Sequence, residues 1–438
     1  MIKITVIGTG YVGLVSGAGI SDFGHNVTCV DVDEKKINQL KSGKIPIYEP
    51  GLKELVKRNV DAKRLTFSKK ISQAIQVADV IIIAVGTPQY ENGEADISAV
   101  KAVAIEIGKN INSYKVICTK STVPVGTGDL ICDLVKNNMI QVTNFDYVSN
   151  PEFLREGSAV KDFLWPDRVV IGASSEKAFE VMRNVYRPLY INEKPMLHTN
   201  IATAEMIKYA ANAFLALKIS YINEVANLCE EVGADVHQVA NAMGKDGRIS
   251  PKFLHPGPGF GGSCFPKDLK AFADLSRKNG LQMNTIEAAI ITNEIQKKRM
   301  YDKLKALIGG DFNGKTIAIL GLAFKPNTDD VRDSSSIEII KLIIKSGGSV
   351  NAYDPIANDG MANIFPNITY FESWETACKN VDGLAIMTDW NEFRGMDLDC
   401  LRSLMKTPIV LDTRNILSIK KLIEFEYTFD NVGRSVIL

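Results

Sequence analysis

Short apolar runs alternate with amphipathic stretches along the first 150 residues of the chain. β-Branched, apolar runs occur at residues 2–7, 27–31 and 80–85, and the series continues at 116–119 and 147–149. Apolar residues at helical spacing separate these runs, which is typical of strands that alternate with helices. The pattern predicts a parallel, doubly wound α/β sheet, which binds ligands at the carboxyl ends of its strands.

The hydrophobic period changes near residue 199. The stretch 199–232 contains neither proline nor glycine, and its apolar residues recur at helical spacing as far as Gly233. This predicts one helix of roughly 30 residues, well above the mean length. A helix of this length usually bridges two domains or supplies a dimer interface. Residues 233–300 are expected to form further helices, interrupted by the loop HPGPGFGG.

The alternation of strands and helices restarts near Asp311. KTIAIL (315–320) predicts a strand that ends in a turn at Gly321, followed by the helix SSSIEIIKLIIKSG and the strands SVNAYDP, GLAIMT and PIVLD. We therefore expect an α/β protein with two Rossmann-like, doubly wound domains, joined by a long central helix and a helical middle domain. The expected domain boundaries are 1–198, 199–300 and 301–438.

Composition and charge narrow the class of protein. A chain of 438 residues is too long for one compact core, and its 51 Lys and Arg balance its 51 Asp and Glu. No global field favours nucleic acid or an anionic membrane. No apolar run approaches the ~18 residues of a membrane span, and the N-terminus does not resemble a signal peptide. Seven scattered cysteines without a CxxC pair, and four histidines without metal spacing, lead us to expect a cytoplasmic protein without a metal site.

The first strand leads into the glycine motif GTGYVG. This motif lies between a strand and a helix, and Asp31 ends the next strand, which is the pattern of a dinucleotide site. Gly8 allows a tight turn, Gly10 lets a pyrophosphate approach the backbone, and Gly13 lets helix and strand pack closely. Asp31 would bond both ribose hydroxyls and repel a 2′-phosphate, so NAD is favoured over NADP. Lys36 either reaches the adenosine ribose or is a solvated helix residue.

The segment GPGFGGSCFPKD (257–268) is the strongest chemical signal of the chain. Its four glycines let the backbone approach a ligand closely. Ser263 is the expected N-cap of the following helix, which places Cys264 in the first turn, where the helix dipole and Lys267 both favour a thiolate. Asp268 follows one turn later on the same side. A buried structural cysteine is the alternative, but we expect Cys264 to be a covalent nucleophile and the other six cysteines to be structural.

Other polar residues lie where the predicted parallel strands end. Glu152, in NPEFLREG, follows the last predicted strand of the first domain, and Glu156 lies one turn later. Glu152 is either a general base or a carboxylate that favours a helix N-terminus. Lys208 and Asn212 are four residues apart on the long apolar helix and therefore share one face. Thr122, in CTKSTVPVGT, follows a strand and could touch cofactor or substrate.

Together these motifs resemble those of the UDP-glucose/GDP-mannose dehydrogenase family. The resemblance rests on GTGYVG, VGTP, KSTVPVGT, NPEFLREGSAV, the helix of Lys208 and Asn212, GFGGSCFPKD and GLAFKPNTDDVRDSSS, and it covers nearly the whole chain. It implies that residues 1–198 bind NAD, 199–300 carry the cysteine loop and dimerise, and 301–438 bind a UDP-sugar. It further implies oxidation of the sugar C6 alcohol to a carboxylate by two hydride transfers, through a thiohemiacetal and a thioester on Cys264.

The choice of nucleotide sugar is less firmly indicated. GSAVKDFLWPDRVVIG and the cysteine loop favour the branch of the family that acts on UDP-glucose. Members that act on GDP-mannose or on an N-acetylated UDP-hexosamine are the alternative. A nucleotide-binding protein without catalytic activity is a further alternative from another class, because fold alone does not establish function.

The resemblance also implies roles for single residues. Lys208 and Asp268, with an ordered water, would assist loss of the alcohol proton, and Asn212 and Lys208 would stabilise the oxyanion formed when Cys264 attacks. Glu152, with Thr122 and Asp268, would activate the hydrolytic water. The implied NAD contacts are Gly8, Gly10, Tyr11, Val12, Gly13, Asp31, Lys36, Thr87, Thr122, Glu156, Lys267 and Arg332. The implied UDP-sugar contacts are Glu152, Phe153, Leu154, Arg155, Glu156, Lys208, Asn212, Arg248, Phe253, Leu254, His255, Pro256, Gly257, Gly261, Phe324, Lys325 and Arg414.

Some of these implied contacts concern the assembly of two chains and the site of the second nucleotide. The resemblance implies a homodimer through the long helix, with Arg248 and Arg414 reaching the sugar or phosphate across the interface. The turn GLAFKP, which carries Phe324 and Lys325, lacks the second and third glycines of a dinucleotide motif, so its nucleotide should be held differently. His255 stands where eukaryotic members often have a lysine, so that contact is not carried over.

Overall fold

The computed structural model describes residues 1–90, 92–191 and 194–434, and the chain folds as two compact units. The first unit comprises Met1–Ala211 with Arg277–Asn279, and the second comprises Asn212–Ser276 with Gly280–Leu438. The boundary between the units falls inside the long helix. The three domain boundaries expected from the sequence remain a prediction.

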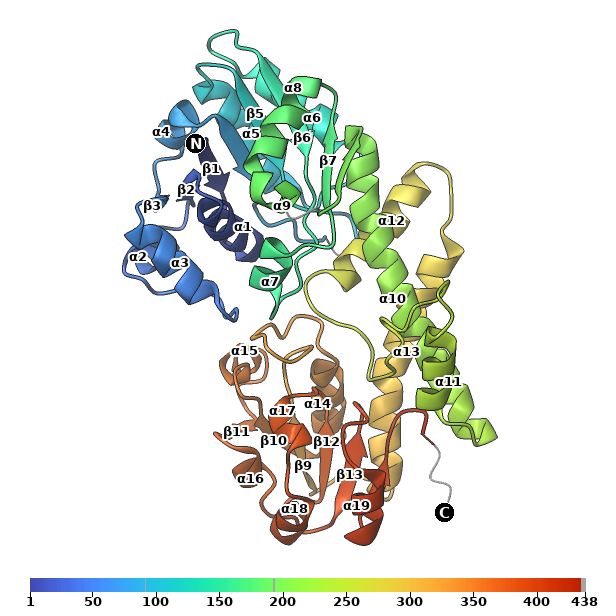
Figure 1. The fold of residues 1–438 in the computed structure, drawn as a ribbon. Coiled ribbons are helices and arrows are strands. Elements are labelled where there is room, and N and C mark those ends of the chain that lie inside the picture. Colours follow the sequence, from blue (N-terminus) through green and yellow to red (C-terminus); the bar gives the residue numbers. More distant parts are fainter. Residues whose placement is uncertain (91, 192–193, 435–438) are drawn as a thin grey trace. The chain divides into compact units, whose positions relative to one another are not determined.

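The first unit contains a sheet whose described strands follow the order β3-β2-β1-β4-β5-β6-β7-β8 (Figure 1). These strands are β1 Lys3–Ile7, β2 Asn26–Val30, β3 Leu65–Ser68, β4 Val80–Ile83, β5 Lys115–Thr119, β6 Phe145–Ser149, β7 Val169–Ala173 and β8 Met196–Thr199. The helices are α1 Tyr11–Asp22, α2 Glu34–Lys41, α3 Leu52–Asp61, α4 Ile71–Val77, α5 Ser98–Asn110, α6 Thr127–Asn137, α7 Ala159–Leu164, α8 Glu176–Val185 and α9 Arg187–Ile191.

The expected doubly wound sheet is confirmed, but it is larger and less uniform than the sequence predicted. Strands β1 to β6 are parallel in register, whereas β7 runs antiparallel to β6, and β8 runs parallel to β7. Glu152 does follow β6, but β6 is not the last strand of the first sheet, as we had expected, because β7 and β8 come later in the chain. Strand β8 gave no clear apolar signal because its side chains are partly exposed.

Alternate residues of the central strands supply two separate cores. In β4, Val80 and Ile82 join one apolar cluster, which also contains Leu14 of α1. Ile81 and Ile83 join the other cluster, together with residues of α4, α5 and α6. Because successive side chains of a strand point to opposite faces, both faces of the sheet are covered by helices.

The second unit contains a parallel sheet in the order β11-β10-β9-β12-β13-β14 among the described residues (Figure 1). Its strands are β9 Thr316–Leu320, β10 Ser349–Tyr353, β11 Thr369–Tyr370, β12 Gly383–Ile386, β13 Ile409–Asp412 and β14 Thr428–Asp430. Its helices are α11 Val236–Gly244, α12 Phe265–Lys278, α13 Asn284–Leu307, α14 Ser335–Lys345, α15 Asn358–Ala362, α16 Trp374–Ala377, α17 Asn391–Arg394, α18 Leu398–Leu404 and α19 Ile419–Glu424. This sheet confirms the second Rossmann-like domain.

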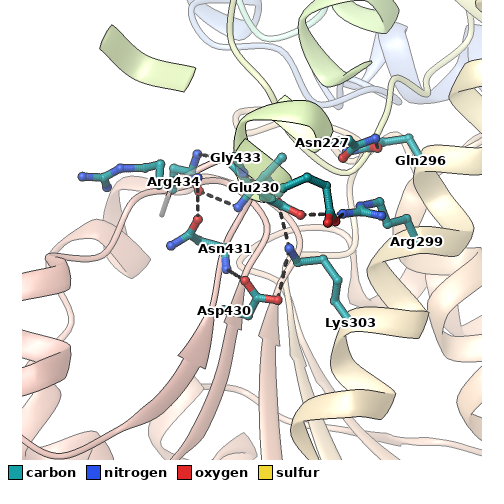
Figure 2. A network of polar contacts seen from close by, with 12 residues as sticks. Asn227, Glu230, Gln296, Arg299, Lys303, Asp430, Asn431, Gly433 and Arg434 are labelled. Atoms are coloured by element: carbon teal, nitrogen blue, oxygen red, sulfur yellow. Dashed lines mark hydrogen bonds and ion pairs between the residues drawn. The ribbon is translucent and has the colours of Figure 1, made fainter. Parts of the chain in front are cut away.

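The long helix of the sequence prediction is α10, Ile201–Val232. Its C-terminal part packs with α13 and with the end of the chain through a charged network (Figure 2). Glu230 of α10 accepts hydrogen bonds from Arg299 (2.6 Å), Lys303 (2.8 Å) and the Gly433 amide (2.8 Å). Lys303 also pairs with Asp430 at 3.1 Å. The network therefore joins the last strand of the second sheet to both long helices.

No helix in the described ranges combines the length and the apolar character needed to cross a membrane.

Candidate active site

The glycine turn after β1 has the geometry that a dinucleotide requires. Gly8 has φ +104°, and a Cβ there would lie 2.4 Å from the Ala84 carbonyl oxygen. A Cβ at Gly13 would lie 2.0 Å from the Gly8 carbonyl oxygen, whereas a Cβ at Gly10 would meet no described atom within 4 Å. Gly10 also caps α1 without a side-chain hydrogen bond. The turn therefore offers open space and unbonded amides to a pyrophosphate.

Asp31 follows β2 and faces this turn. Its Oδ2 accepts hydrogen bonds from the amide and the hydroxyl of Thr9, both at 2.7 Å, and its Oδ1 accepts the Asp33 amide at 3.0 Å. Partial burial raises the pKa of Asp31, but these hydrogen bonds and the charge of Lys36 outweigh burial, so the pKa lies below its usual value. The carboxylate is thus ionised and ready to accept ribose hydroxyls.

The loops after β4 and β5 meet at two threonines. The Thr87 hydroxyl donates to the Thr122 carbonyl at 2.9 Å, which fixes both predicted cofactor contacts relative to each other. Next to Thr122 in sequence, the buried Lys120 donates to Asn150 (3.1 Å) and to the Tyr186 hydroxyl (3.2 Å). Burial lowers the pKa of Lys120. Sequence reasoning overlooked this lysine, although its place in KSTVPVGT was a usable signal.

Glu152 and Lys208 form a buried pair in the first unit. The Lys208 ammonium donates to the Glu152 carbonyl oxygen (2.7 Å) and to Oε1 of its carboxylate (3.1 Å). Glu152 Oε2 accepts the Leu154 amide. The Phe153 ring lies 5.4 Å from the Lys208 ammonium and 3.5 Å from the Arg168 guanidinium. The fold thus brings together Glu152, one of whose predicted roles is a general base, and Lys208, which is predicted to stabilise an oxyanion, and both side chains are buried.

The alternative reading of Glu152 as a helix-starting carboxylate is wrong. Residues 150–155 adopt no helix, a turn follows at Glu156, and α7 begins only at Ala159. The side chain of Arg155 is bound to Asp162, with contacts of 2.9 and 2.6 Å. This loop lines one side of a pocket of about 190 Å³, together with Lys120 and Arg168.

The cysteine loop differs from the expectation by one residue. Helix α12 begins at Phe265, and the Cys264 carbonyl accepts the Asp268 amide at 2.9 Å. Cys264 therefore occupies the cap position that we had assigned to Ser263, and it does not lie in the first turn. The boundary shifts because Ser263 and Cys264 can both precede Pro266, whose fixed φ suits any position in the first turn. At the cap, the thiol still lies at the positive end of the helix dipole.

Asp268 is the centre of a charged cluster in the second unit. Its Oδ2 accepts the Asn212 amide group at 2.6 Å, and its Oδ1 accepts the Lys267 ammonium at 2.5 Å. Only 1% of the Asp268 side chain is exposed. A buried carboxylate with two donors has a fixed position and direction. Lys267, predicted to contact NAD and to favour the thiolate, is thus also a partner of Asp268.

Three amide side chains that sequence reasoning missed hold the glycine loop. Asn223 accepts the Gly257 amide (2.8 Å), and Gln296 donates to the Gly257 carbonyl (2.8 Å). Asn293 accepts the Phe260 amide (2.7 Å) and donates to its carbonyl (3.0 Å). A polar residue on the buried face of a long helix was the available signal, because such a group needs a partner.

The turn after β9 lies beside this loop. A Cβ at Gly262 would lie 2.7 Å from the Phe324 ring, and one at Gly257 would lie 3.4 Å from the Arg414 guanidinium. Arg414 donates to the carbonyls of Phe324 (3.0 Å) and Met387 (2.7 Å). Arg414 thus lies beside predicted UDP-sugar contacts of its own chain. A contact of Arg414 with the UDP-sugar of its own chain is therefore an alternative to the predicted contact across a dimer interface.

The turns after β1 and β9 repeat one another. The Gly8 amide donates to Val30 and the Gly321 amide donates to Tyr353, both at 2.8 Å. Asp354 corresponds to Asp31, but it is buried and accepts the amides of Leu322, Ala323, Ile356 and Ala357 as well as the Trp390 indole. Because its oxygens already accept these five hydrogen bonds, Asp354 is not available to a ribose in the way predicted for Asp31. This agrees with the expectation that the second domain holds its nucleotide differently from a dinucleotide motif.

The remaining predicted contacts lie on the surface or in the glycine loop. Arg248 is exposed and pairs with Asp246 at 2.6 Å, and Arg332 pairs with Asp330 at 2.8 Å. Phe253 has φ +65°. In the same segment Leu254, Pro256 and Gly261 are buried, whereas His255 is exposed. Val12 and Lys325 are half-buried. Ligand contacts at these positions remain predictions.

Comparison with known proteins identifies the family. Residues 2–190 match the NAD binding domain of the UDP-glucose/GDP-mannose dehydrogenase family, residues 202–295 its central domain, and residues 318–419 its UDP binding domain. UDP-glucose 6-dehydrogenase TuaD of Bacillus subtilis is 48% identical, covering 100% of this chain and 94% of that protein. UDP-glucose 6-dehydrogenase of Rhizobium meliloti is also 48% identical, covering 99% of each chain.

A solved structure gives the same result for the fold. The UDP-glucose dehydrogenase of Pyrobaculum islandicum superposes with a TM-score of 0.92 at 37% identity, covering 99% of this chain and 98% of that one. The resemblance drawn from the motifs is therefore confirmed, as is NAD as the cofactor. This chain belongs to the UDP-glucose/GDP-mannose dehydrogenase family and is an NAD-dependent nucleotide-sugar dehydrogenase.

Proposed function

We propose that this chain oxidises the C6 alcohol of UDP-glucose to the carboxylate of UDP-glucuronate, with Cys264 as covalent nucleophile. The observation that carries the substrate is similarity over the full length to two proteins named UDP-glucose 6-dehydrogenase, each 48% identical. The family also contains enzymes for other nucleotide sugars, and the substrate panel described below compares them directly.

The first oxidation uses the two buried clusters. The Gly8–Gly13 turn and Asp31 would hold NAD, which would accept the hydride in both oxidations. As the C6–H bond breaks, the hydroxyl proton passes through a water to Asp268, and the Lys208 ammonium stabilises the oxygen that loses it. Asp268 is suited to this role because Asn212 and Lys267 hold its carboxyl group in a fixed direction. The product of this step is an aldehyde.

The second oxidation proceeds through a covalent intermediate on the Cys264 sulfur. The Cys264 thiolate adds to the aldehyde carbon and forms a C–S bond, while Asn212 and Lys208 stabilise the oxyanion. This oxyanion re-forms the C=O bond as the second hydride leaves, which gives a thioester. Glu152 then takes a proton from a water, the hydroxide attacks, and the C–S bond breaks to return the thiolate. One alcohol, one water and two NAD⁺ thus give one carboxylate, two NADH and three protons.

We further propose a homodimer that forms through α10, in the cytoplasm. Phe214, Tyr221 and Leu228 are each about half or more exposed and recur every seven residues on this helix. Such a spacing produces an apolar stripe suited to packing against a second helix. Four of the cysteines are buried in apolar surroundings, which agrees with a reducing compartment.

A substrate panel with NADH stoichiometry tests the proposal. Purified protein is incubated with limiting UDP-glucose, GDP-mannose or UDP-N-acetylmannosamine, and NADH is counted against sugar consumed. We expect two NADH per UDP-glucose and little from the other sugars. Turnover of GDP-mannose without turnover of UDP-glucose would refute the substrate, and one NADH per sugar would refute the thioester route.

A further inference from the structure

A buried carboxylate outside every motif joins the dinucleotide turn to the loop after β6. Glu49 lies between α2 and α3 and is 6% exposed. Its Oε2 accepts the hydroxyl of Tyr11, the first residue of α1, and the Gly157 amide at 2.6 Å. Its Oε1 accepts the Ala159 amide at 2.7 Å. Gly157 directly follows Glu156, so Glu49 connects the starts of α1 and α7.

The three groups close a triangle of hydrogen bonds. Besides bonding Glu49, the Gly157 amide also donates to the Tyr11 oxygen at 3.1 Å. Burial, followed by the hydrogen bond to Glu49, raises the pKa of Tyr11, so its hydroxyl stays protonated and donates. Moving a donor away from a buried carboxylate raises the free energy of the folded state, because the charge is then poorly compensated. The triangle therefore resists separation of its members.

Tyr11 and Gly157 each adjoin the predicted contact of a different ligand. Tyr11 follows Gly10, where the backbone is open to the pyrophosphate. Gly157 ends the loop that carries Glu152, which the proposed function places at the reacting sugar. A ligand that fixes the first turn of α1 also fixes Tyr11, and through Glu49 it restricts Gly157. Restriction of a loop before its ligand arrives lowers the entropy cost of the second binding event.

We propose that Tyr11, Glu49 and Gly157 couple the two sites, so that each of the nucleotides NAD and UDP-sugar raises the affinity for the other. This inference rests on the proposed function, because it takes the loop that carries Glu152 to meet the sugar nucleotide. The Tyr11 hydroxyl and the Glu49 carboxylate act as positioning groups, since they act through the two loops they join. Coupling of binding is reciprocal, so it is measurable from either ligand.

Calorimetric titration of UDP-glucose, with and without saturating NADH, tests the coupling. NADH is used because it accepts no hydride, so both ligands bind without turnover. In the unaltered protein we expect NADH to lower the Kd of UDP-glucose at least about fivefold. In Tyr11→Phe, which keeps the ring and removes the hydroxyl, we expect the Kd ratio to fall to near one. Glu49→Gln, which replaces one acceptor by a donor, should also bring the Kd ratio to near one.

Tyr114→Phe is the matched control, because its hydroxyl also bonds a carboxylate in the same unit, that of Asp146 at 2.6 Å. This variant should keep the Kd ratio of the unaltered protein. A ratio of one in the unaltered protein, or an unchanged ratio in both Tyr11→Phe and Glu49→Gln, would overturn the coupling. If the substrate panel selects another nucleotide sugar, the proposed substrate fails, and the same titration with that sugar still decides the coupling.

Discussion

At the scale of single residues, Cys264 carries the most specific prediction. Cys264→Ser should lower kcat at least about 1000-fold, because a neutral hydroxyl at the helix cap cannot replace the thiolate in forming the thioester. Binding of NADH and UDP-glucose should remain, since serine nearly matches cysteine in size. Turnover is measured by NADH release and binding by calorimetry.

The control for this variant is Cys400→Ser, which alters an exposed cysteine of α18. It should keep full activity. Substantial two-step turnover by Cys264→Ser would contradict the covalent route, even if both variants fold and bind nucleotides normally.

At the same scale, we predict that Asp31 governs the choice of cofactor. Asp31→Asn removes a charged acceptor of ribose hydroxyls and sets an amide against the Thr9 donors. Loss of a charge-assisted hydrogen bond of about 1.5–3 kcal/mol should raise the KM for NAD roughly 10- to 100-fold. The preference for NAD over NADP should also narrow, because the carboxylate no longer repels a 2′-phosphate. A variant with unchanged KM values for both cofactors would show that Asp31 does not hold the ribose.

At the scale of elements, Glu205 links α10 to the loop that carries Thr122. It lies three residues before Lys208, and its carboxylate accepts the amides of Gly126 and Gly128 at 2.8 and 2.9 Å. Helix α6 has no side-chain cap of its own at Gly126, so Glu205 supplies that cap. Burial raises the pKa of Glu205 to about 7, against the lowering effect of the two amides.

The raised pKa predicts how stability depends on pH. Between its unfolded value of 4.5 and about 7, the folded protein binds more protons at Glu205 than the unfolded chain does. This contribution to stability is therefore fully present below pH 4.5 and is lost as pH rises through 7, by up to about 3 kcal/mol. Glu205→Gln, a mimic of the protonated form, should lack this loss.

Urea unfolding at pH 5 and pH 7.5 measures this difference. The control is Glu180→Gln, which alters an exposed carboxylate of α8. Glu180→Gln should follow the unaltered protein, whereas Glu205→Gln should gain relative stability at pH 7.5. An equal response of all three proteins to pH would show that Glu205 keeps an ordinary pKa.

The same scale shows what the sequence could predict and what it could not. Glycines in the first turn were informative because Gly8 and Gly13 face backbone atoms at distances that admit no side chain. The length of α10 followed from the absence of helix breakers. Strand β8 was missed because it is partly exposed, and the start of α12 was misplaced by one residue because two neighbouring residues suit the cap.

The polar supports of the site escaped prediction for a different reason. Asn223, Asn293 and Gln296 bind the glycine loop from positions 33–39 residues away in sequence. Glu49 binds Gly157 from 108 residues away. Such pairs form only when the chain is folded, so no local period or spacing reveals them. Motifs therefore indicate candidate ligand contacts, whereas the groups that hold the loops are recognised only in the folded chain.

At the scale of the whole molecule, the two Rossmann-like folds differ in how available their corresponding acidic residues are to a ligand. Asp31 is partly exposed, whereas Asp354 is buried and bonded within its own domain. Each nucleotide should therefore stabilise its own unit first. A ligand at 100 times its Kd should slow amide exchange through unfolding of its unit about 100-fold.

Hydrogen exchange detected by mass spectrometry can resolve these two effects in one experiment. NADH should protect β1, α1 and β2, because they form the turn and carry Asp31. Uridine diphosphate should protect β9, α14 and the loop at Gly257–Gly262, which contacts Phe324. Helix α10 belongs to both units and should respond to either ligand. Equal protection of both sheets by uridine diphosphate alone would mean that the units unfold together, and the separate-unit account would then be wrong.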